Sequence, residues 1–285
     1  MAEKYTRLIK SVTGNGTTAL IIKPTTGKRV HAFQLALTYA GGVNTIAGLM
    51  LALTSIRVKV GTVIKWQLTG TQLRDYLLLF GTTFDFNGLP NTGAQVTIPL
   101  APEWFLANVA DALAWNPAKL GGDITLEITS ANALTCVAYE VTSDDIDAPS
   151  AGIVTLEVIT PVAGGTSFYT GEELELRGRL LSASIYPDST NSREITPAGL
   201  YLGKDNLAAH EELTSAENDE TLERKGLTPA AAGRTANIYD IVAVKDDMLS
   251  RAWDLPAWGK ARIKVNAALV MAGTCSILLA RLEAR

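Results

Sequence analysis

Short runs in which apolar and polar residues alternate recur along the whole chain. Three of them, at 56–60, 124–128 and 262–265, read IRVKV, ITLEI and RIKV. Alternation with a period of two predicts a β-strand with one buried and one wet face. Glycine-rich and proline-rich turn signals separate the runs, for example Gly41-Gly42 and Gly121-Gly122. Many short strands divided by turns predict an all-β sandwich or barrel.

Helical periodicity is confined to a few segments. The segment Thr69 to Phe80 begins with a candidate Thr cap and continues with leucines at helical spacing, and Trp104 to Leu113 is a second short amphipathic candidate. The most charged stretch, Asp205 to Lys225, is predicted to be a surface loop with helical turns. Two apolar stretches, 41–56 and 265–280, are shorter than a membrane span and are interpreted as pairs of buried strands.

The two halves of the chain resemble each other in the order of their features. Ala114-Trp115 precedes a Pro/Gly turn, an alternating strand and an apolar strand that holds Thr135-Cys136. Ala252-Trp253 precedes the same series, which ends in Thr274-Cys275, and the two tryptophans are 138 positions apart. A further correspondence is expected between 68–73 and 195–200. Such self-similarity predicts a duplicated domain.

An acidic stretch, SDDIDAPS at 143–150, lies between the two halves. Its Pro, Ser and charge content is typical of an exposed connection. The sequence therefore predicts two domains: 1–147, which includes a basic N-terminal arm, and 148–285.

Composition excludes several classes of function. With 25 Lys+Arg against 29 Asp+Glu, the chain has a net charge of −4, so we expect no broad basic face and no direct binding of nucleic acid. The two cysteines and two histidines are widely spaced, so neither a disulfide framework nor a zinc site is expected. The N-terminus lacks the apolar core of a signal peptide, and we expect the chain to stay in the cytoplasm where it is made.

Two segments contain candidate ligand-binding or contact residues. Asp144, Asp145 and Asp147 could supply oxygen ligands to a structural calcium ion, but the stretch lacks the spacing of an EF-hand, and a solvated linker is the favoured interpretation. Lys4, Arg7 and Lys10 alternate with apolar residues and could contact anionic lipid or a neighbouring subunit. An ordinary edge strand is the alternative for this second segment. No other cofactor is expected.

No catalytic constellation is evident. His31 and His210 lie in different predicted domains, and a triad or metal cluster needs converging groups. The carboxylates of Glu211 and Glu212 lie in the most polar stretch, without apolar neighbours that would raise a pKa. The matched positions of Trp115 and Trp253 favour packing, with the indole N–H hydrogen-bonded, over carbohydrate stacking. We therefore predict that the chain is not an enzyme.

Two tandem sandwich units of this kind resemble the double jelly-roll major capsid proteins of tailless, internal-membrane phages of the corticovirus and tectivirus type. The resemblance rests in the first half on Leu53 to Gly81 and on Val96 to Pro102 (VTIPLAP). In the second half it rests on Glu173 to Pro187 and on Ile238 to the C-terminus. Two departures are the Pro197 that stands where the first half has Gly70, and the stretch Asp205 to Lys225, which has no expected counterpart.

The resemblance implies an all-β fold of two tandem eight-stranded jelly-roll sandwiches with a few short helices in loops. It implies a homotrimer that tiles an icosahedral virion shell over an internal membrane, with neighbouring capsomers, minor capsid proteins and vertex proteins as partners. Synthesis and assembly are expected in the host cytoplasm. A single jelly roll fused to another β domain, a two-domain spike that binds a receptor or carbohydrate, and an amidase or glycosidase on a double sandwich are the alternatives.

Overall fold

The computed structural model describes residues 4–15, 19–39, 46–82, 93–102, 104, 110–160, 174–186, 198–205, 207–243, 252–265 and 276–284. The chain divides into two compact units. The first comprises Met1–Leu77 and Thr82–Thr155 with the last two residues, and the second comprises Leu78–Gly81 and Leu156–Glu283. The division thus falls after Thr155, inside a strand, whereas the sequence placed a boundary at 147/148 in the acidic connection.

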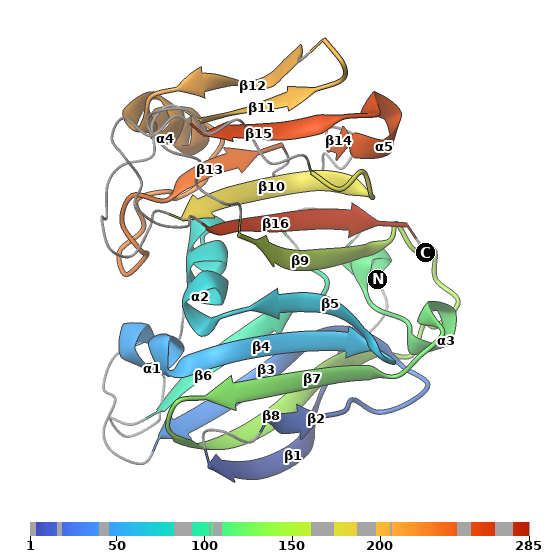
Figure 1. Cartoon of the computed structure of the whole chain (residues 1–285). Helices are drawn as coiled ribbons and strands as arrows, with labels where there is room; N and C mark the ends of the chain where they lie inside the picture. Colours follow the sequence, from blue (N-terminus) through green and yellow to red (C-terminus); the bar gives the residue numbers. More distant parts are fainter. Residues whose placement is uncertain are drawn as a thin grey trace. The chain divides into compact units, whose positions relative to one another are not determined.

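The described part of the first unit contains eight strands arranged in two sheets (Figure 1). The strands are β1 (Tyr5–Asn15), β2 (Leu20–Ile22), β3 (Arg29–Tyr39), β4 (Leu53–Val60), β5 (Val63–Leu68), β6 (Gly93–Pro99), β7 (Ile124–Ser130) and β8 (Ala133–Ser143). One sheet has the order β1-β8-β3-β6 and the other contains the order β5-β4-β7-β2. Two four-stranded sheets with these crossovers form a jelly roll.

Apolar side chains at alternating positions of the strands form the core of this unit. In β7 the residues Ile124, Leu126 and Ile128 are buried, and the residues between them are only partly covered. Val58 and Ile56 of β4 stand opposite Leu126 and Ile128 in the antiparallel register, so their side chains enter the same core. The strands predicted at 56–60 and 124–128 are therefore confirmed.

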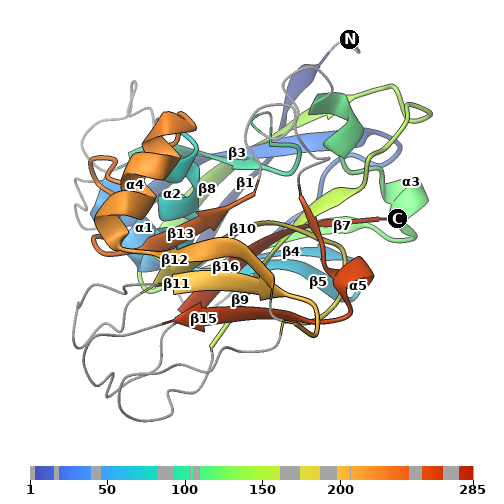
Figure 2. The same ribbon diagram turned by 90° about the horizontal axis from the view of Figure 1, so that it is seen from above.

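The second unit repeats the strand order of the first. Its strands are β9 (Ile153–Ile159, which begins in the first unit), β10 (Arg179–Tyr186), β11 (Ala198–Leu202), β12 (Leu207–Leu213), β13 (Tyr239–Val242), β14 (Trp253–Asp254), β15 (Ala261–Val265) and β16 (Ser276–Glu283). One run of strands has the order β13-β10-β16-β9, and β14 also pairs with β10. The other sheet has the order β12-β11-β15, and its three strands lie side by side in both Figure 1 and Figure 2.

Strand by strand, the second unit matches the first. The run β9-β16-β10-β13 corresponds to β1-β8-β3-β6, and β12-β11-β15 corresponds to β5-β4-β7. The position of β2 falls between β9 and β10, where residues 161–173 lie outside the described residues. The core of this unit includes Leu180 and Ile185 of β10, Ile241 of β13 and Leu279 of β16. The predicted double jelly roll is confirmed.

The helices required one correction. The apolar stretch 41–56, predicted as strands, contains the helix α1 (Ile46–Ala52) before β4. Of the predicted helix at Trp104 to Leu113, residues 105–109 lie outside the described residues, and Ala110–Leu113 form a 3-10 turn. The predicted helix at Thr69 to Phe80 is confirmed as α2 (Gly70–Leu79).

The charged stretch Asp205 to Lys225 does have a counterpart, so its interpretation as an unmatched loop was wrong. It contains β12 and the helix α4 (Ser215–Arg224), which correspond to β5 and α2. Both helices begin with the same reciprocal cap. Thr69 exchanges hydrogen bonds with Gln72, and Thr214 does so with Glu217. The expected match of 68–73 with 195–200 was also wrong, because Gly70 opens a helix and Ala198 opens a strand.

The tryptophan correspondence is confirmed by two short helices. Trp115 precedes α3 (Pro117–Leu120) and strand β7, while Trp253 precedes α5 (Leu255–Trp258) and strand β15. Each helix has a proline in its first turn and ends at a left-handed glycine, with φ of 74° at Gly121 and 66° at Gly259. Proline at the start and glycine after the end is the pairing that short helices favour.

Candidate functional site

The acidic turn after β8 is held by neighbouring residues of the first unit. The Lys28 ammonium lies 2.7 Å from an oxygen of Asp144. Arg29 donates to the backbone oxygen of Asp145 at 3.3 Å, and the Asn116 amide donates to the backbone oxygen of Ile146 at 2.6 Å. The turn is therefore fixed mainly through its backbone, with the side chains of the aspartates exposed.

These aspartates are not gathered around a common point. Across the described ranges, no group of three or more His, Cys, Asp or Glu side chains is placed to hold a metal ion, and Asp144, Asp145 and Asp147 lie within those ranges. The ion pair with Lys28 already supplies positive charge to Asp144. A structural calcium ion here stays a prediction that rests on the sequence.

The basic N-terminal segment forms an edge strand. β1 pairs with β8 from Tyr5 opposite Thr142 to Asn15 opposite Ala133, with an irregularity between Leu8 and Lys10. The side chains of Lys4 and Arg7 are exposed, and that of Lys10 lies outside the described part. Over this range the segment is a strand of the first jelly roll and not a free arm. Whether its cations touch lipid or a neighbour stays a prediction.

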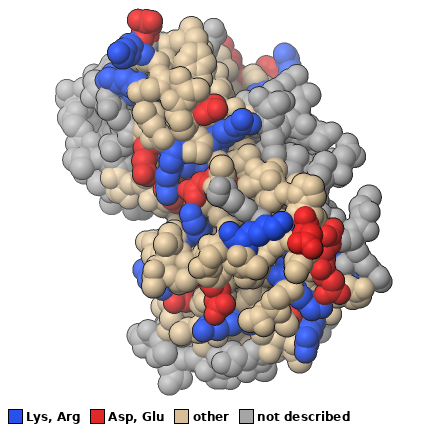
Figure 3. Space-filling view, turned by 90° about the vertical axis from the view of Figure 1, so that its right-hand side faces the viewer, with Lys and Arg blue, Asp and Glu red and all other residues tan. Residues whose placement is uncertain are grey.

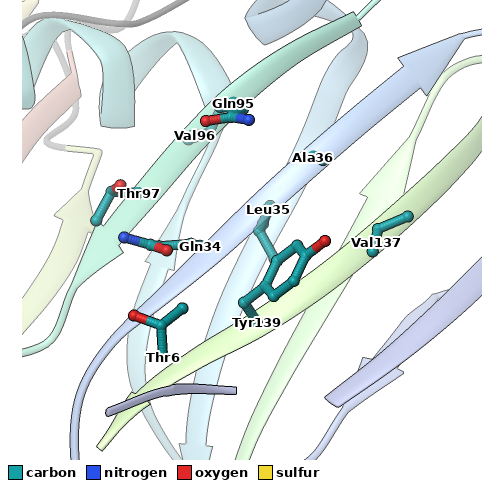
Figure 4. Close-up of a pocket in the computed structure, with 9 residues that line it drawn as sticks. All are labelled: Thr6, Gln34, Leu35, Ala36, Gln95, Val96, Thr97, Val137 and Tyr139. Atoms are coloured by element: carbon teal, nitrogen blue, oxygen red, sulfur yellow. The ribbon is translucent and has the colours of Figure 1, made fainter. Parts of the chain in front are cut away.

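The outer face of the sheet β1-β8-β3-β6 carries a shallow hollow of about 450 Å³. Leu35 and Val96 are buried beneath it, while Gln34 and Thr97 stand on the exposed side of their strands. Figure 4 shows Gln34, Thr97 and Tyr139 on the near side of the sheet, around the hollow. Its lining residues carry no formal charge, and they hold hydroxyl and amide groups but no ionisable pair suited to acid–base chemistry.

The histidines sit in separate structural settings. His31 Nε2 lies 2.9 Å from the Ser143 hydroxyl inside the first unit. His210 in the second unit packs edge-on against Tyr239, and burial together with the positive charge of Lys225 lowers its pKa to about 4. Each imidazole makes these contacts inside its own unit.

Sequence comparison identifies no relative. No protein-family model matches the chain, and no curated protein is significantly similar to it. Structure comparison gives a different result. The major capsid protein of bacteriophage PM2 is similar over 99% of both chains, with a TM-score of 0.73 at 14% identity.

Two further solved structures support this likeness. A chain from Sulfolobus Turreted Icosahedral Virus matches 98% of this chain and 90% of its own length, with a TM-score of 0.65 at 11% identity. The Faustovirus major capsid protein matches 100% and 91%, with a TM-score of 0.53 at 8% identity. This chain has the double jelly-roll fold of viral major capsid proteins.

Each roll of the double jelly roll contains a buried charged side chain that the sequence analysis missed, and in the second roll this side chain belongs to an ionic cluster. In the second roll, Arg281 is 1% exposed and donates to Glu157 at 2.7 Å and to the backbone oxygen of Glu175 at 2.9 Å. Glu157 also accepts from Arg177, which pairs with Glu283 at 3.2 Å. The cluster joins β9 to β16, and the signal that could have revealed it is the single arginine inside the apolar strand SILLARLE.

The first roll buries its own carboxylate. Glu140 of β8 has no exposed surface and accepts from both the backbone N–H and the hydroxyl of Thr25, at 2.6 and 2.5 Å. Removal of one partner from a buried, bonded charge is strongly destabilising. The buried Glu140 and Arg281 therefore serve to fix the segments that they contact.

The thiol and the first tryptophan of the double jelly roll are structural groups. Burial raises the pKa of the Cys136 thiol to about 12, so the reactive thiolate is scarce near neutral pH. Trp115 is fully buried and its indole N–H donates to the backbone oxygen of Leu100 at 3.1 Å, as predicted for a packing role. Cys275 lies outside the described residues.

Charge is mixed on the surface seen in Figure 3. Lysine and arginine side chains alternate there with aspartate and glutamate over short distances, without a broad area of one sign among the coloured residues. This pattern matches the small net charge of the sequence. Among the described residues, no helix has both the length and the apolar character needed to cross a membrane.

Proposed function

We propose that this chain is a major capsid protein that assembles as a homotrimer into pseudo-hexagonal capsomers of an icosahedral virion. One observation carries the proposal: the whole chain, through both rolls, matches viral major capsid proteins, with 99% of each chain covered in the comparison with the bacteriophage PM2 protein. Three copies of a duplicated roll supply six similar units, which suits a six-sided tile. Cyclic symmetry is the usual way in which identical subunits close such a ring.

The internal build of the rolls supports a structural role. In both rolls, buried charged groups form hydrogen bonds that join separate segments of the chain, as at Glu140 and Arg281. Among the described residues, no group of His, Cys, Asp and Glu side chains is placed to hold a metal ion, and the hollow on the first roll is lined by uncharged residues. We therefore propose a structural role without catalytic activity.

The setting of the protein is part of the same proposal. We propose that the chain is made in the host cytoplasm and resides in the virion shell, over an internal membrane, beside minor capsid and vertex proteins. The resemblance to internal-membrane phage capsids supports this setting. No separate role in nucleic-acid binding is proposed, because the chain has a net charge of −4.

Light scattering coupled to size-exclusion chromatography tests the proposal. We expect a mass near three times 30.3 kDa, about 91 kDa, and pseudo-hexagonal particles in negative-stain images. A protein that stays monomeric up to high micromolar concentration, and that binds glycans on an array, would instead support the two-domain spike. That outcome would overturn the capsid assignment.

A further inference from the structure

Each roll ends one of its sheets in a strand that has only one partner among the described strands. In the first unit β1 pairs with β8 alone, and in the second unit β12 pairs with β11 alone. An open strand edge presents unpaired backbone N–H and C=O groups to any chain that approaches it. Proteins that remain monomeric usually protect such edges by shortness, charge or cover.

These two edge strands carry exposed apolar side chains. On β1, Tyr5 is 43% and Leu8 is 57% exposed, and on β12 Leu207 is 58% exposed. Apolar side chains standing out on an open strand favour association with another chain. β1 is also eleven residues long, so shortness does not protect it.

The two edges differ in the sign of their charge. The segment from Lys4 through β1 contains Lys4, Arg7 and Lys10 and has no acidic residue up to Asn15. Strand β12, LAAHEEL, contains Glu211 and Glu212 and no lysine or arginine. Complementary charge of this kind selects the correct partner and disfavours the pairing of each edge with a copy of itself.

We propose that β1 of one copy packs along β12 of a second copy, so that the contact between subunits is head-to-tail. This inference rests on the proposed function and names the surfaces that build the capsomer. A heterologous contact uses two different patches of each chain, and it closes into a ring when the rotation between subunits permits. The basic N-terminal strand is thereby assigned to a neighbouring subunit and not to lipid.

Charge reversal on each edge tests the pairing. Arg7→Glu/Lys10→Glu makes the sequence of β1 acidic, like that of β12, and Glu211→Lys/Glu212→Lys makes the sequence of β12 basic, like that of β1. We expect each variant to weaken self-association by at least about tenfold, because juxtaposed like charges cost several kcal/mol. The variant with all four substitutions should return to within about threefold of the parent, because the charges are again opposite.

A matched control keeps the change in charge but leaves the edges intact. Lys23 and Lys119 are exposed residues of the same unit, outside β1. Lys23→Glu/Lys119→Glu should self-associate like the parent, and circular dichroism should show that every variant is folded. Equal weakening in this control would mean that net charge alone governs association, and the proposed pairing would be wrong.

The remaining outcomes separate this inference from the function. If the parent is a trimer and neither edge variant changes its mass, the pairing is wrong while the capsid proposal stands. If the parent never associates, the capsid proposal itself fails. If Arg7→Glu/Lys10→Glu abolishes flotation with phosphatidylglycerol vesicles without changing the mass, β1 is a lipid contact and the pairing is overturned.

Discussion

The two rolls have the same strand order but bury different side chains at corresponding positions, and the tryptophans show this most clearly. Trp115 has no exposed surface, its backbone bridges to Val30 and its indole N–H is bonded to Leu100. Its counterpart Trp253 pairs with Leu180 and remains partly exposed. A repeated position in a duplicated fold therefore keeps its place in the chain without keeping its degree of burial.

The capped helices show the same contrast. α2 buries Leu73, Tyr76 and Leu77, whereas the buried residues of α4 are Asn218 and Leu222. Both start with a reciprocal cap on a threonine. The local signal that begins a helix is thus independent of how much of that helix enters the core.

Truncation of the two tryptophans should give the largest difference in stability between the two rolls. Trp115→Ala removes a fully buried ring and its hydrogen bond, so we expect a loss of about 3–5 kcal/mol in the free energy of unfolding. Trp253→Ala removes a half-buried ring and should lose about 1–2 kcal/mol. Urea unfolding followed by circular dichroism measures both. Equal losses would show that the two positions carry the same packing.

Substitution of one glycine in each roll should give the next largest loss of stability, and the two losses can be compared directly. A Cβ on Gly70 would lie 2.2 Å from the Met50 carbonyl oxygen, and one on Gly178, at φ +60°, would lie 2.5 Å from that of Leu282. We expect Gly70→Ala and Gly178→Ala to lower the melting temperature through a loss of about 2–4 kcal/mol each. Gly27→Ala is the control, since its φ is +77° but its Cβ would meet nothing within 4 Å. It should lose only about 1 kcal/mol.

Low pH should destabilise the second roll through the protonation of His210. The pKa of this histidine in the folded second roll is about 4, below the ordinary value near 6.5, so the unfolded chain binds the proton more readily. Its contribution to stability is present above pH 6.5 and is lost as the pH falls toward 4, by up to about 3 kcal/mol. Melting curves between pH 7 and 4 measure this loss. His210→Gln should flatten the dependence, and an unchanged slope in that variant would contradict the assignment.

The caps should give the smallest and most equal effects. Thr69→Ala and Thr214→Ala each remove an N-cap side chain, and each should lose about 1 kcal/mol. The Thr→Ser variants keep a hydroxyl at each cap and should retain most of the stability. Thermal melting of the four variants tests whether the two caps are energetically equivalent. A much larger loss at Thr69 would mean that this residue also supports the packing of α2.

Local patterns in the sequence determined the positions of many strands and helices. Alternation located β4, β7 and β15, because successive side chains of a strand face opposite sides. The repeat of a tryptophan, a proline and a glycine marked the two places where α3 and α5 lie, although it predicted turns there and not helices. The cap at Thr69 located α2. These features depend on residues close together in the chain, so the sequence expresses them directly.

Tertiary structure decided which elements correspond and where charge is buried. The apolar run that forms α1 fits a helix or a strand equally well, since periodicity is lost when every position is apolar. The equivalence of α4 with α2 follows from the pairing of β12 with β11, and the bond between Arg281 and Glu157 joins residues 124 positions apart. Long-range pairing depends on the folded chain bringing distant strands together, and no local pattern encodes which partner each strand will meet.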